Sequence, residues 1–220
     1  MNHPNMKVSI ILLCHNAREY VLRCLDSIER QVNVNYELII VDNDSAPSES
    51  AEFFRRSFGK KPFKFLRSPQ NLFFSGGMNL GARCANRDST HLLLLNSDVE
   101  FLSEDAIQKL LRAHRRGATG FEFLTNPDRS DGFCLLVDRD IYDRLGGLDE
   151  HYKWWWSITK LQGQILSLGF LIQAIENYQD TLVHYGGKSG DAWRSVNISE
   201  CPPEAEFWFP RNYQVSCIRL

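Results

Sequence analysis

The sequence lacks the features that would place it across a membrane or on nucleic acid. Its 220 residues contain no apolar run of about 18 residues, the length that a membrane-spanning helix needs. The 25 basic and 27 acidic residues leave no cationic excess of the kind that nucleic-acid-binding domains carry. The apolar stretch 8–14 has neither a strongly basic leader nor a small-residue cleavage site, which favours a buried strand over a signal peptide.

Paired cysteine motifs are also missing. The six cysteines are Cys14, Cys24, Cys84, Cys134, Cys201 and Cys217. None forms a Cys-x-x-Cys pair, and a chain of this length does not need disulfides for its stability. We expect reduced cysteines in the core and a cytoplasmic or otherwise reducing compartment. No group of histidines and cysteines has the spacing of a zinc site, so the sequence does not predict zinc.

The sequence does contain an alternation of strand and helix patterns. The expected strands are residues 8–13, 37–41, 64–67, 91–95, 133–137 and 171–175. The expected helices are 16–31, 48–58 capped by Ser48, 76–87, a segment capped by Ser103, 138–145 and 153–168. This alternation predicts an α/β fold with a mainly parallel sheet flanked by helices. We expect one domain over residues 1–190, and a C-terminal extension, 191–220, packed on the domain or on a partner.

Polar residues follow three of the expected strands where each one ends. They are His15 and Asn16, then Asp42 and Asn43, then Asn96, Ser97 and Asp98. Asp and Asn are common turn residues, so one such group alone indicates little. Together they predict a ligand site, because ligands of parallel sheets bind beyond the carboxyl ends of the strands. The oxygens of Asp98 and Asn96 suit Mg²⁺ or Mn²⁺ bound to phosphate.

A glycine-rich segment opens the expected helix 76–87. Gly76, Gly77 and Asn79 do not have the spacing of a dinucleotide-binding loop, and they lie in the middle of the chain. Two interpretations remain open. The glycines either bring the start of a helix close to a bound nucleotide or sugar, or they allow the helix to pack closely on the sheet.

These landmarks, in this order, resemble family 2 glycosyltransferases with the GT-A fold, and in particular their bacterial rhamnosyl- and galactofuranosyltransferase-like branch. The resemblance covers about residues 6–190. It is carried by segments 8–11 with Asn16, 37–45, Asn71, 76–81, 93–99, 132–139 and 145–150, and by a His-x-x-Gly-x-Ser loop that begins at His184.

The resemblance implies inverting, metal-assisted transfer of a sugar from a UDP- or dTDP-linked donor to a glycan or lipid-linked glycan, as in polysaccharide biosynthesis. It implies Mg²⁺ or Mn²⁺ at Asp98 and His184, although a purely structural role for His184 stays open. The implied nucleotide-sugar-binding residues are His15, Asn16, Asp42, Asn43, Gly76, Gly77, Asn79, Asn96 and Ser97. The implied location is the cytoplasm or the cytoplasmic face of a membrane. Peripheral membrane contact and a homo-oligomer stay open.

The sequence departs from this family at the catalytic base. Ser157 and Ile158 stand where the family has an acidic pair, so Asp131, Asp149 and Glu150 become the candidate bases. The tryptophans that follow, Trp154, Trp155 and Trp156, fit either an acceptor site or a core. The missing acids leave a second reading open, a sugar-nucleotide-binding module without transfer activity. A third reading is a nucleotidyltransferase, which would prefer a free nucleoside triphosphate.

Overall fold

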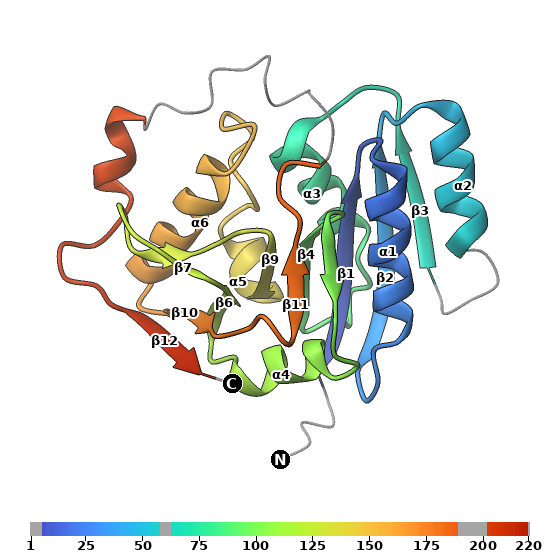
Figure 1. The fold of residues 1–220 in the computed structure, drawn as a ribbon. Helices are drawn as coiled ribbons and strands as arrows, with labels where there is room; N and C mark the ends of the chain where they lie inside the picture. Colours follow the sequence, from blue (N-terminus) through green and yellow to red (C-terminus); the bar gives the residue numbers. More distant parts are fainter. Residues whose placement is uncertain (1–5, 58–62, 189–201, 220) are drawn as a thin grey trace.

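An eight-stranded sheet forms the centre of the protein (Figure 1). This computed structural model describes residues 6–57, 63–188 and 202–219. In order across the sheet, the strands are β12 (Val215–Arg219), β10 (Leu171–Glu176), β6 (Gly117–Phe121), β9 (Cys134–Asp138), β4 (His91–Asn96), β1 (Lys7–Cys14), β2 (Asn35–Asn43) and β3 (Phe63–Ser68). Only β9 runs antiparallel to its neighbours, β4 and β6. The predicted mainly parallel α/β sheet is confirmed.

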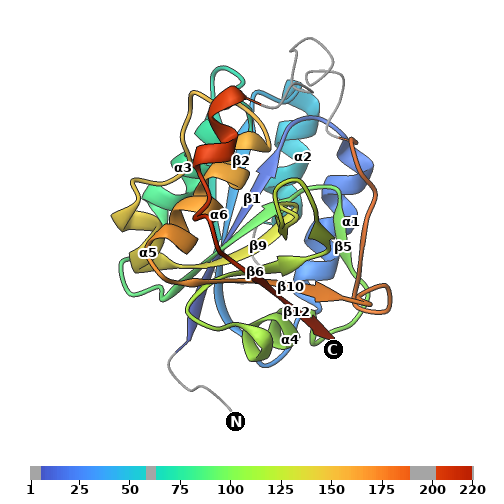
Figure 2. The ribbon, with the colours of Figure 1, turned by 90° about the vertical axis from the view of Figure 1, so that its left-hand side faces the viewer.

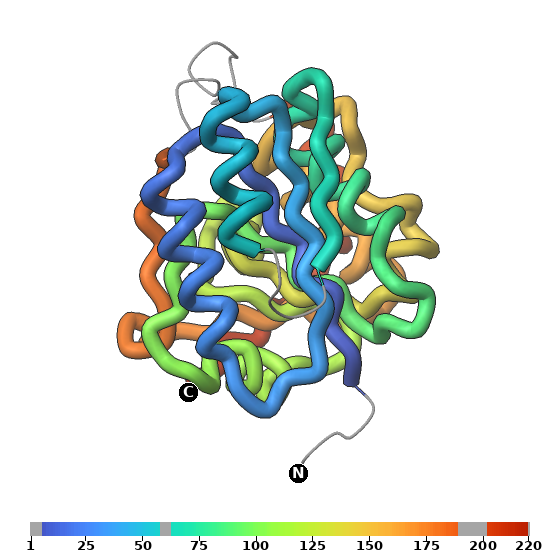
Figure 3. The backbone as a smooth tube through the Cα atoms, turned by 90° about the vertical axis from the view of Figure 1, so that its right-hand side faces the viewer, coloured from blue at the N-terminus to red at the C-terminus, as the bar shows by residue number. Residues whose placement is uncertain are grey.

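Helices cover both faces of the sheet. One face carries α1 (Arg18–Glu29), α2 (Pro47–Ser57) and α4 (Ala106–Ala113). The other carries α3 (Phe73–Cys84), α5 (Arg139–Arg144) and α6 (Trp156–Ser167). Figure 2 shows this second group, and Figure 3 shows α1 and α2 side by side. Because successive strand residues point to opposite faces, Ile10 and Leu12 pack under α1 while Ile11 packs under α3.

Several predicted boundaries are wrong. Helix α3 begins at Phe73 rather than Gly76, α2 begins one residue before Ser48, and Asp105 rather than Ser103 stands at the cap position of α4. Strand β6 was not predicted because its sequence, Gly-Ala-Thr-Gly-Phe, has little of the apolar, β-branched character of a strand. Its glycines follow from close packing: a Cβ on Gly120 would lie 2.4 Å from the hydroxyl oxygen of Ser130.

Two small antiparallel sheets lie near the carboxyl end of β4 and are formed by later segments of the chain. Strand β5 (Val99–Phe101) pairs with β11 (Leu182–His184), and the hairpin of β7 (Phe123–Leu124) and β8 (Arg129–Ser130) precedes β9. A short 3-10 helix, η2 (Pro203–Phe207), precedes β12. Strand β12 lies in the expected C-terminal extension, 191–220, for which no strand was predicted, and it pairs with β10 at the sheet edge. Residues 191–201 lie outside the described part of the chain.

Most of the described cysteines belong to the core. Cys14, Cys24 and Cys134 are fully buried among apolar side chains. Within the described ranges, no helix has the length and apolar character needed to cross a bilayer.

Candidate functional site

A cavity of about 460 Å³ lies beyond the carboxyl ends of β1, β2 and β4. Nine of the predicted site residues contribute to its wall: His15, Asn43, Asn96, Ser97, Asp98, Asp131, Trp154, Trp155 and His184. They come from segments that are far apart in the sequence. The sheet order brings them together, because β1, β2 and β4 are neighbours and end at the same edge. The predicted convergence of polar groups at that edge is therefore present.

Asp98 and His184 lie next to each other in the cavity wall. Asp98 ends the turn after β4, and the pairing of β11 with β5 sets His184 opposite Val99. This register leaves Nε2 of His184 3.4 Å from Oδ1 of Asp98. The Asp98 side chain is only 4% exposed, and its Oδ2 accepts a hydrogen bond from the backbone N–H of Lys188 at 3.2 Å.

The electrostatics of Asp98 favour its charged form. Burial alone would raise the pKa of this carboxyl, but the His184 imidazole and the backbone N–H groups outweigh burial and hold the pKa below its ordinary value. The His184 ring is fixed by stacking on Phe133, with ring centroids 4.3 Å apart. Its Nε2 is buried and makes no hydrogen bond within the described residues. A buried imidazole nitrogen facing a carboxylate fits a pair of ligands for a divalent cation.

Asp131 is the only predicted base that reaches the cavity. Its Oδ1 accepts hydrogen bonds from the backbone N–H groups of Gly132 and Phe133. Its Oδ2 has no hydrogen-bond partner among the residues that the structure describes. Burial raises the pKa of the Asp131 carboxyl, partly offset by the Gly132 N–H and by the charge of His184. The result is an oriented carboxylate with one free oxygen and a strengthened affinity for protons.

The other two candidate bases lie outside the cavity wall. Asp149 forms an ion pair with Lys160 at 2.5 Å, and Glu150 accepts a hydrogen bond from Asn79 at 2.9 Å. Burial raises the pKa of Asp149, but Lys160 and a backbone N–H more than offset this and hold the pKa below its ordinary value. Among the three candidate acids, Asp131 alone is part of the cavity wall, and which of them acts as the base stays a prediction.

The positions of the missing acidic pair are apolar or buried in the structure. Ile158, on α6, lines the cavity and packs against Gly132, where a Cβ would lie 2.8 Å from the isoleucine Cγ2. Ser157 is fully buried, and its hydroxyl donates to the backbone oxygen of Trp154 at 2.7 Å. Asp131, the residue before Gly132, therefore stands next to the place that the family's acid would occupy.

A hydrogen-bonded loop network that the sequence did not reveal shapes one side of the cavity. The Asn43 amide donates to Oδ1 of Asn71 at 2.9 Å and to the Phe73 backbone oxygen at 3.0 Å. Oδ1 of Asn43 accepts from the N–H of Leu72 at 2.8 Å. Phe73 has φ 57°, a conformation that bulky side chains rarely adopt. Asn71 and Phe73 both line the cavity. No sequence pattern indicated Phe73, whose position depends on this unusual backbone conformation.

Asp42 was predicted to hold the donor, but its carboxylate does not line the cavity. It is fully buried and accepts hydrogen bonds from the Ser45 N–H at 3.0 Å, the Ser50 hydroxyl and the Arg67 guanidinium at 3.2 Å. Asn16 is likewise absent from the wall, and its side-chain oxygen accepts from the N–H of Ala46 at 2.9 Å. In this structure both residues fix the loops after β1 and β2.

The glycines at the start of α3 allow close packing against β1 and the preceding loop. A Cβ on Gly77 would lie 2.3 Å from Cδ1 of Leu13, and one on Gly76 would lie 3.0 Å from Cβ of Leu72. Neither glycine lines the cavity. Of the two interpretations of this segment, the structure shows the close approach of a helix to the sheet.

Asn79 has a comparable internal role. Its Oδ1 accepts hydrogen bonds from the Tyr142 hydroxyl at 2.7 Å and from the Leu148 N–H at 2.9 Å. Its amide donates to the Leu148 backbone oxygen at 2.8 Å as well as to Glu150. These bonds tie α3 to the turn after α5, and Asn79 is not part of the cavity wall. Its contact with the donor stays a prediction.

Two of the three consecutive tryptophans reach the cavity. Trp154 and Trp155 are part of its wall, and the Trp155 side chain is among the exposed large apolar groups, at 45%. Trp156 points elsewhere and packs against Trp208, with ring centroids 6.4 Å apart. Nε1 of Trp154 is buried without a hydrogen-bond partner among the described residues.

Comparisons with known proteins agree with this architecture. The family model described as glycosyl transferase family 2 matches residues 9–165. The chain is 29% identical over 114 residues to a dolichol-phosphate mannosyltransferase of Pyrococcus furiosus, covering 51% of this chain and 31% of that protein. It is also 24% identical over 188 residues to the uncharacterized protein y4gI of Sinorhizobium fredii, covering 65% of this chain and 20% of that protein.

Solved structures show the same fold. The mannosyltransferase PcManGT from Pyrobaculum calidifontis, in complex with GDP-Man and Mn²⁺, matches with a TM-score of 0.67 at 16% identity, over 85% of this chain and 59% of that one. TarS 1-349 from S. aureus, in complex with UDP, matches with a TM-score of 0.57 at 13% identity, over 73% and 55%. The chain thus spans less than two thirds of each of these proteins.

Proposed function

This chain belongs to glycosyl transferase family 2, and from that premise we propose that it transfers one sugar from a nucleotide-diphospho-sugar to a hydroxyl group of a glycan or lipid-linked glycan. One observation carries the proposal. Asp98, His184 and Asp131 line a single cavity, so a pair of cation ligands and an oriented base face the same space.

We assign the donor to the side of the cavity formed by the ends of β1, β2 and β4. His15 and Asn43 are held together by a 2.8 Å hydrogen bond from the His15 ring to the Asn43 backbone oxygen, and they offer a preformed wall to the nucleoside. Asp98 and His184 would hold Mg²⁺ or Mn²⁺, which would offset the charge of the diphosphate as it leaves. One matched structure contains GDP-Man and the other contains UDP, so the nucleotide base of the donor is a quantity to measure.

Asp131 is the proposed catalytic base. Its free Oδ2 takes the proton from the acceptor hydroxyl while that oxygen forms a bond to the anomeric carbon of the sugar. The bond from this carbon to the diphosphate oxygen breaks on the opposite side, and the nucleoside diphosphate leaves with the electron pair. Attack from the side opposite the leaving group inverts the configuration of the sugar. The raised pKa of Asp131 strengthens it as a base.

The acceptor is assigned to the wall that contains Trp154 and Trp155. The half-exposed indole of Trp155 offers an apolar face that suits the C–H face of a sugar ring. The unpaired Nε1 of Trp154 is a hydrogen-bond donor for a hydroxyl group of either substrate. Both tryptophans precede or open α6, so this wall is anchored to the helix that contributes Ile158.

A second candidate function is a binding module that holds the donor without transferring it, and the apolar Ile158 at the position of the family's acid favours it. The test measures nucleoside diphosphate release from UDP-, dTDP- and GDP-sugars with Mn²⁺, with and without a panel of glycan and lipid-linked acceptors. Release that requires Mn²⁺ and disappears in Asp98→Asn supports the enzyme. Nucleotide binding by calorimetry, with no release from any donor, supports the module. A preference for a nucleoside triphosphate in thermal-shift assays would contradict both.

A further inference from the structure

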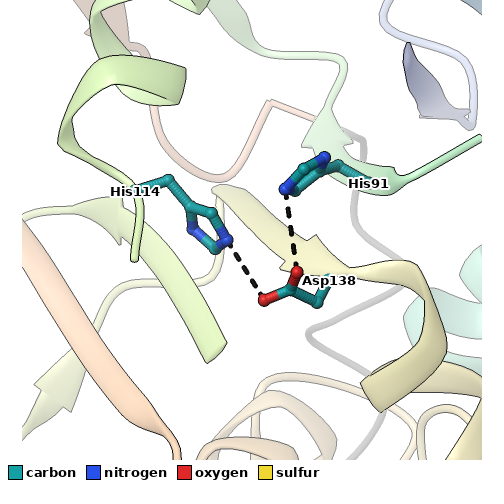
Figure 4. Close-up of side chains that lie close together, drawn as sticks. All are labelled: His91, His114 and Asp138. Carbon is teal, nitrogen blue, oxygen red and sulfur yellow. Dashed lines mark hydrogen bonds and ion pairs between the residues drawn. The ribbon is translucent and has the colours of Figure 1, made fainter. Parts of the chain in front are cut away.

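Three buried side chains lie close together (Figure 4), at the opposite end of the strands from the cavity. His91 is the first residue of β4, His114 follows α4, and Asp138 is the last residue of β9. The exposed fractions of the three residues are 6%, 7% and 8%. One ligand atom from each lies within 4.8 Å of the other two. Since β4 ends in Asn96 at the cavity, the cluster is about 16 Å from it along the strand.

Hydrogen bonds around His114 determine which ring nitrogen carries the proton. The Thr119 hydroxyl donates to Oε1 of Gln173 at 3.1 Å. The orientation of that Gln173 amide is fixed, because its nitrogen donates to the Ala113 backbone oxygen at 2.9 Å and its oxygen accepts from the Arg115 N–H. With the Thr119 proton used in this way, we assign Nδ1 of His114, 2.9 Å from the Thr119 hydroxyl oxygen, as the donor of that bond. The lone pair of the neutral ring is left on Nε2.

The same reasoning applies to His91. The Thr90 hydroxyl donates to the backbone oxygen of Lys7 at 3.1 Å and accepts from the Lys7 N–H at 3.0 Å. Nδ1 of His91, at 2.8 Å from this hydroxyl, is then also a donor. Both imidazoles consequently present an electron pair, on Nε2, toward the carboxylate of Asp138. Electron pairs that face one another call for a cation between them.

The distance from His91 fits a metal ion better than a shared proton. Nε2 of His114 is 3.2 Å from Oδ2 of Asp138, within hydrogen-bond range, and Nε2 of His91 is 3.8 Å from Oδ1. Two ligand atoms about 2.1 Å from a tetrahedral zinc ion are roughly 3.4 Å apart, between these two values. A proton on His114 could bridge the shorter gap, but the gap to His91 is too long for a hydrogen bond.

Each of the three side chains also makes a hydrogen bond to a residue outside the cluster. The two histidines donate to threonine hydroxyls, and Asp138 accepts from the Gly117 N–H at 2.7 Å and from the Arg116 guanidinium at 3.4 Å. Metal-binding histidines and carboxylates characteristically have such supporting partners, which fix the tautomer and orientation. Arg116 is itself paired with Asp140, so its charge is shared between two carboxylates.

We propose that His91, His114 and Asp138 bind a zinc-type transition-metal dication, with its remaining coordination position open to water. The three ligands come from β9, from the start of its neighbour β4 and from the residues leading into its other neighbour, β6. A metal here would cross-link three adjacent strands at the edge away from the cavity. Its role is structural, and the site is separate from the Asp98–His184 pair.

The test uses the full chain carrying Asp98→Asn and His184→Gln, so that the cavity pair does not contribute. After chelator treatment, Co²⁺ is titrated and visible absorption is recorded, and Zn²⁺ is then used to displace Co²⁺. We expect one Co²⁺ per chain, with the intense visible bands of a four-coordinate ion. At a hundredfold excess of free Zn²⁺ over its Kd, we expect the Tm to rise by about 5–11 °C.

Variants locate the bound ion. His114→Gln, or His91→Gln if the first variant does not fold, should abolish the Co²⁺ bands and the Zn²⁺-dependent rise in Tm. His151→Gln changes an exposed histidine outside the cluster and should leave both intact. Absence of the bands in the starting chain, or their persistence in the cluster variant, overturns the proposal. His114 and Asp138 would then be a proton-bridged pair.

Discussion

Replacing Asp131 by asparagine separates catalysis from folding at the cavity. The amide oxygen can keep the place of Oδ1 and accept from the N–H groups of Gly132 and Phe133, while the NH₂ group takes the place of the free Oδ2. The variant loses the proton acceptor and little else. Loss of a general base costs about 10²- to 10⁴-fold in rate, equivalent to roughly 3–5 kcal/mol of activation free energy.

We therefore expect kcat for Asp131→Asn to fall about 10²- to 10⁴-fold, with the KM for the donor changed little. The Tm should not fall, because the folded protein already disfavours the charged form of this carboxyl. Initial rates of nucleoside diphosphate release and thermal unfolding are measured on the same preparations. Asp149→Asn makes the same chemical change outside the cavity and should retain most of the activity. If Asp131→Asn keeps more than a tenth of the wild-type kcat, Asp131 is not the base.

Three further predictions follow from the geometry. The value of kcat/KM should fall at acidic pH with an apparent pKa above about 3.9, the ordinary value for Asp, because Asp131 must be deprotonated and its pKa is raised. An apparent pKa at or below about 3.9 would contradict the assignment of Asp131 as the base. Asp98→Asn should weaken the Mn²⁺-dependent binding of nucleoside diphosphate at least tenfold by calorimetry while leaving metal-free binding within about threefold, since one charged ligand of the cation is lost; equal affinities with Mn²⁺ would refute it. Gly77→Ala should lower the Tm by up to about 10 °C, since the new methyl would lie 2.3 Å from Leu13, and the overpacking cost of about 1–3 kcal/mol exceeds the gain of about 0.5–1 kcal/mol for alanine inside a helix; a raised Tm would refute this.

The sequence predicted those parts of the fold where local pattern and tertiary role agree. Strands β1, β2 and β4 contain buried apolar runs because both of their faces are covered, and their patterns were sufficient. Strand β6 was missed because its glycines are required by contacts with residues distant in sequence, such as Ser130. Strand β12 gains its structure only by pairing with β10.

The same distinction applies to the candidate site. Asp98 could be predicted because it lies in the polar turn that follows a strand, and His184 because of a family resemblance. Gly77 and Asn79 matched that resemblance too, but their contacts are internal to the fold. The cluster of His91, His114 and Asp138 was invisible, because its members are 23 and 24 residues apart and no spacing rule connects them. Only the order of the strands brings them together.

The reversed direction of β9 has a consequence for how this protein could acquire new specificity. Parallel strands deliver the loops that follow them to the cavity, whereas β9 delivers the residues that precede it, Asp131 and Gly132. The hairpin of β7 and β8 leads directly into these residues. Insertions in that hairpin would change the part of the cavity wall next to Asp131 and leave the ends of β1, β2 and β4 as they are. If the proposed function holds, the choice of acceptor can then vary independently of the choice of donor.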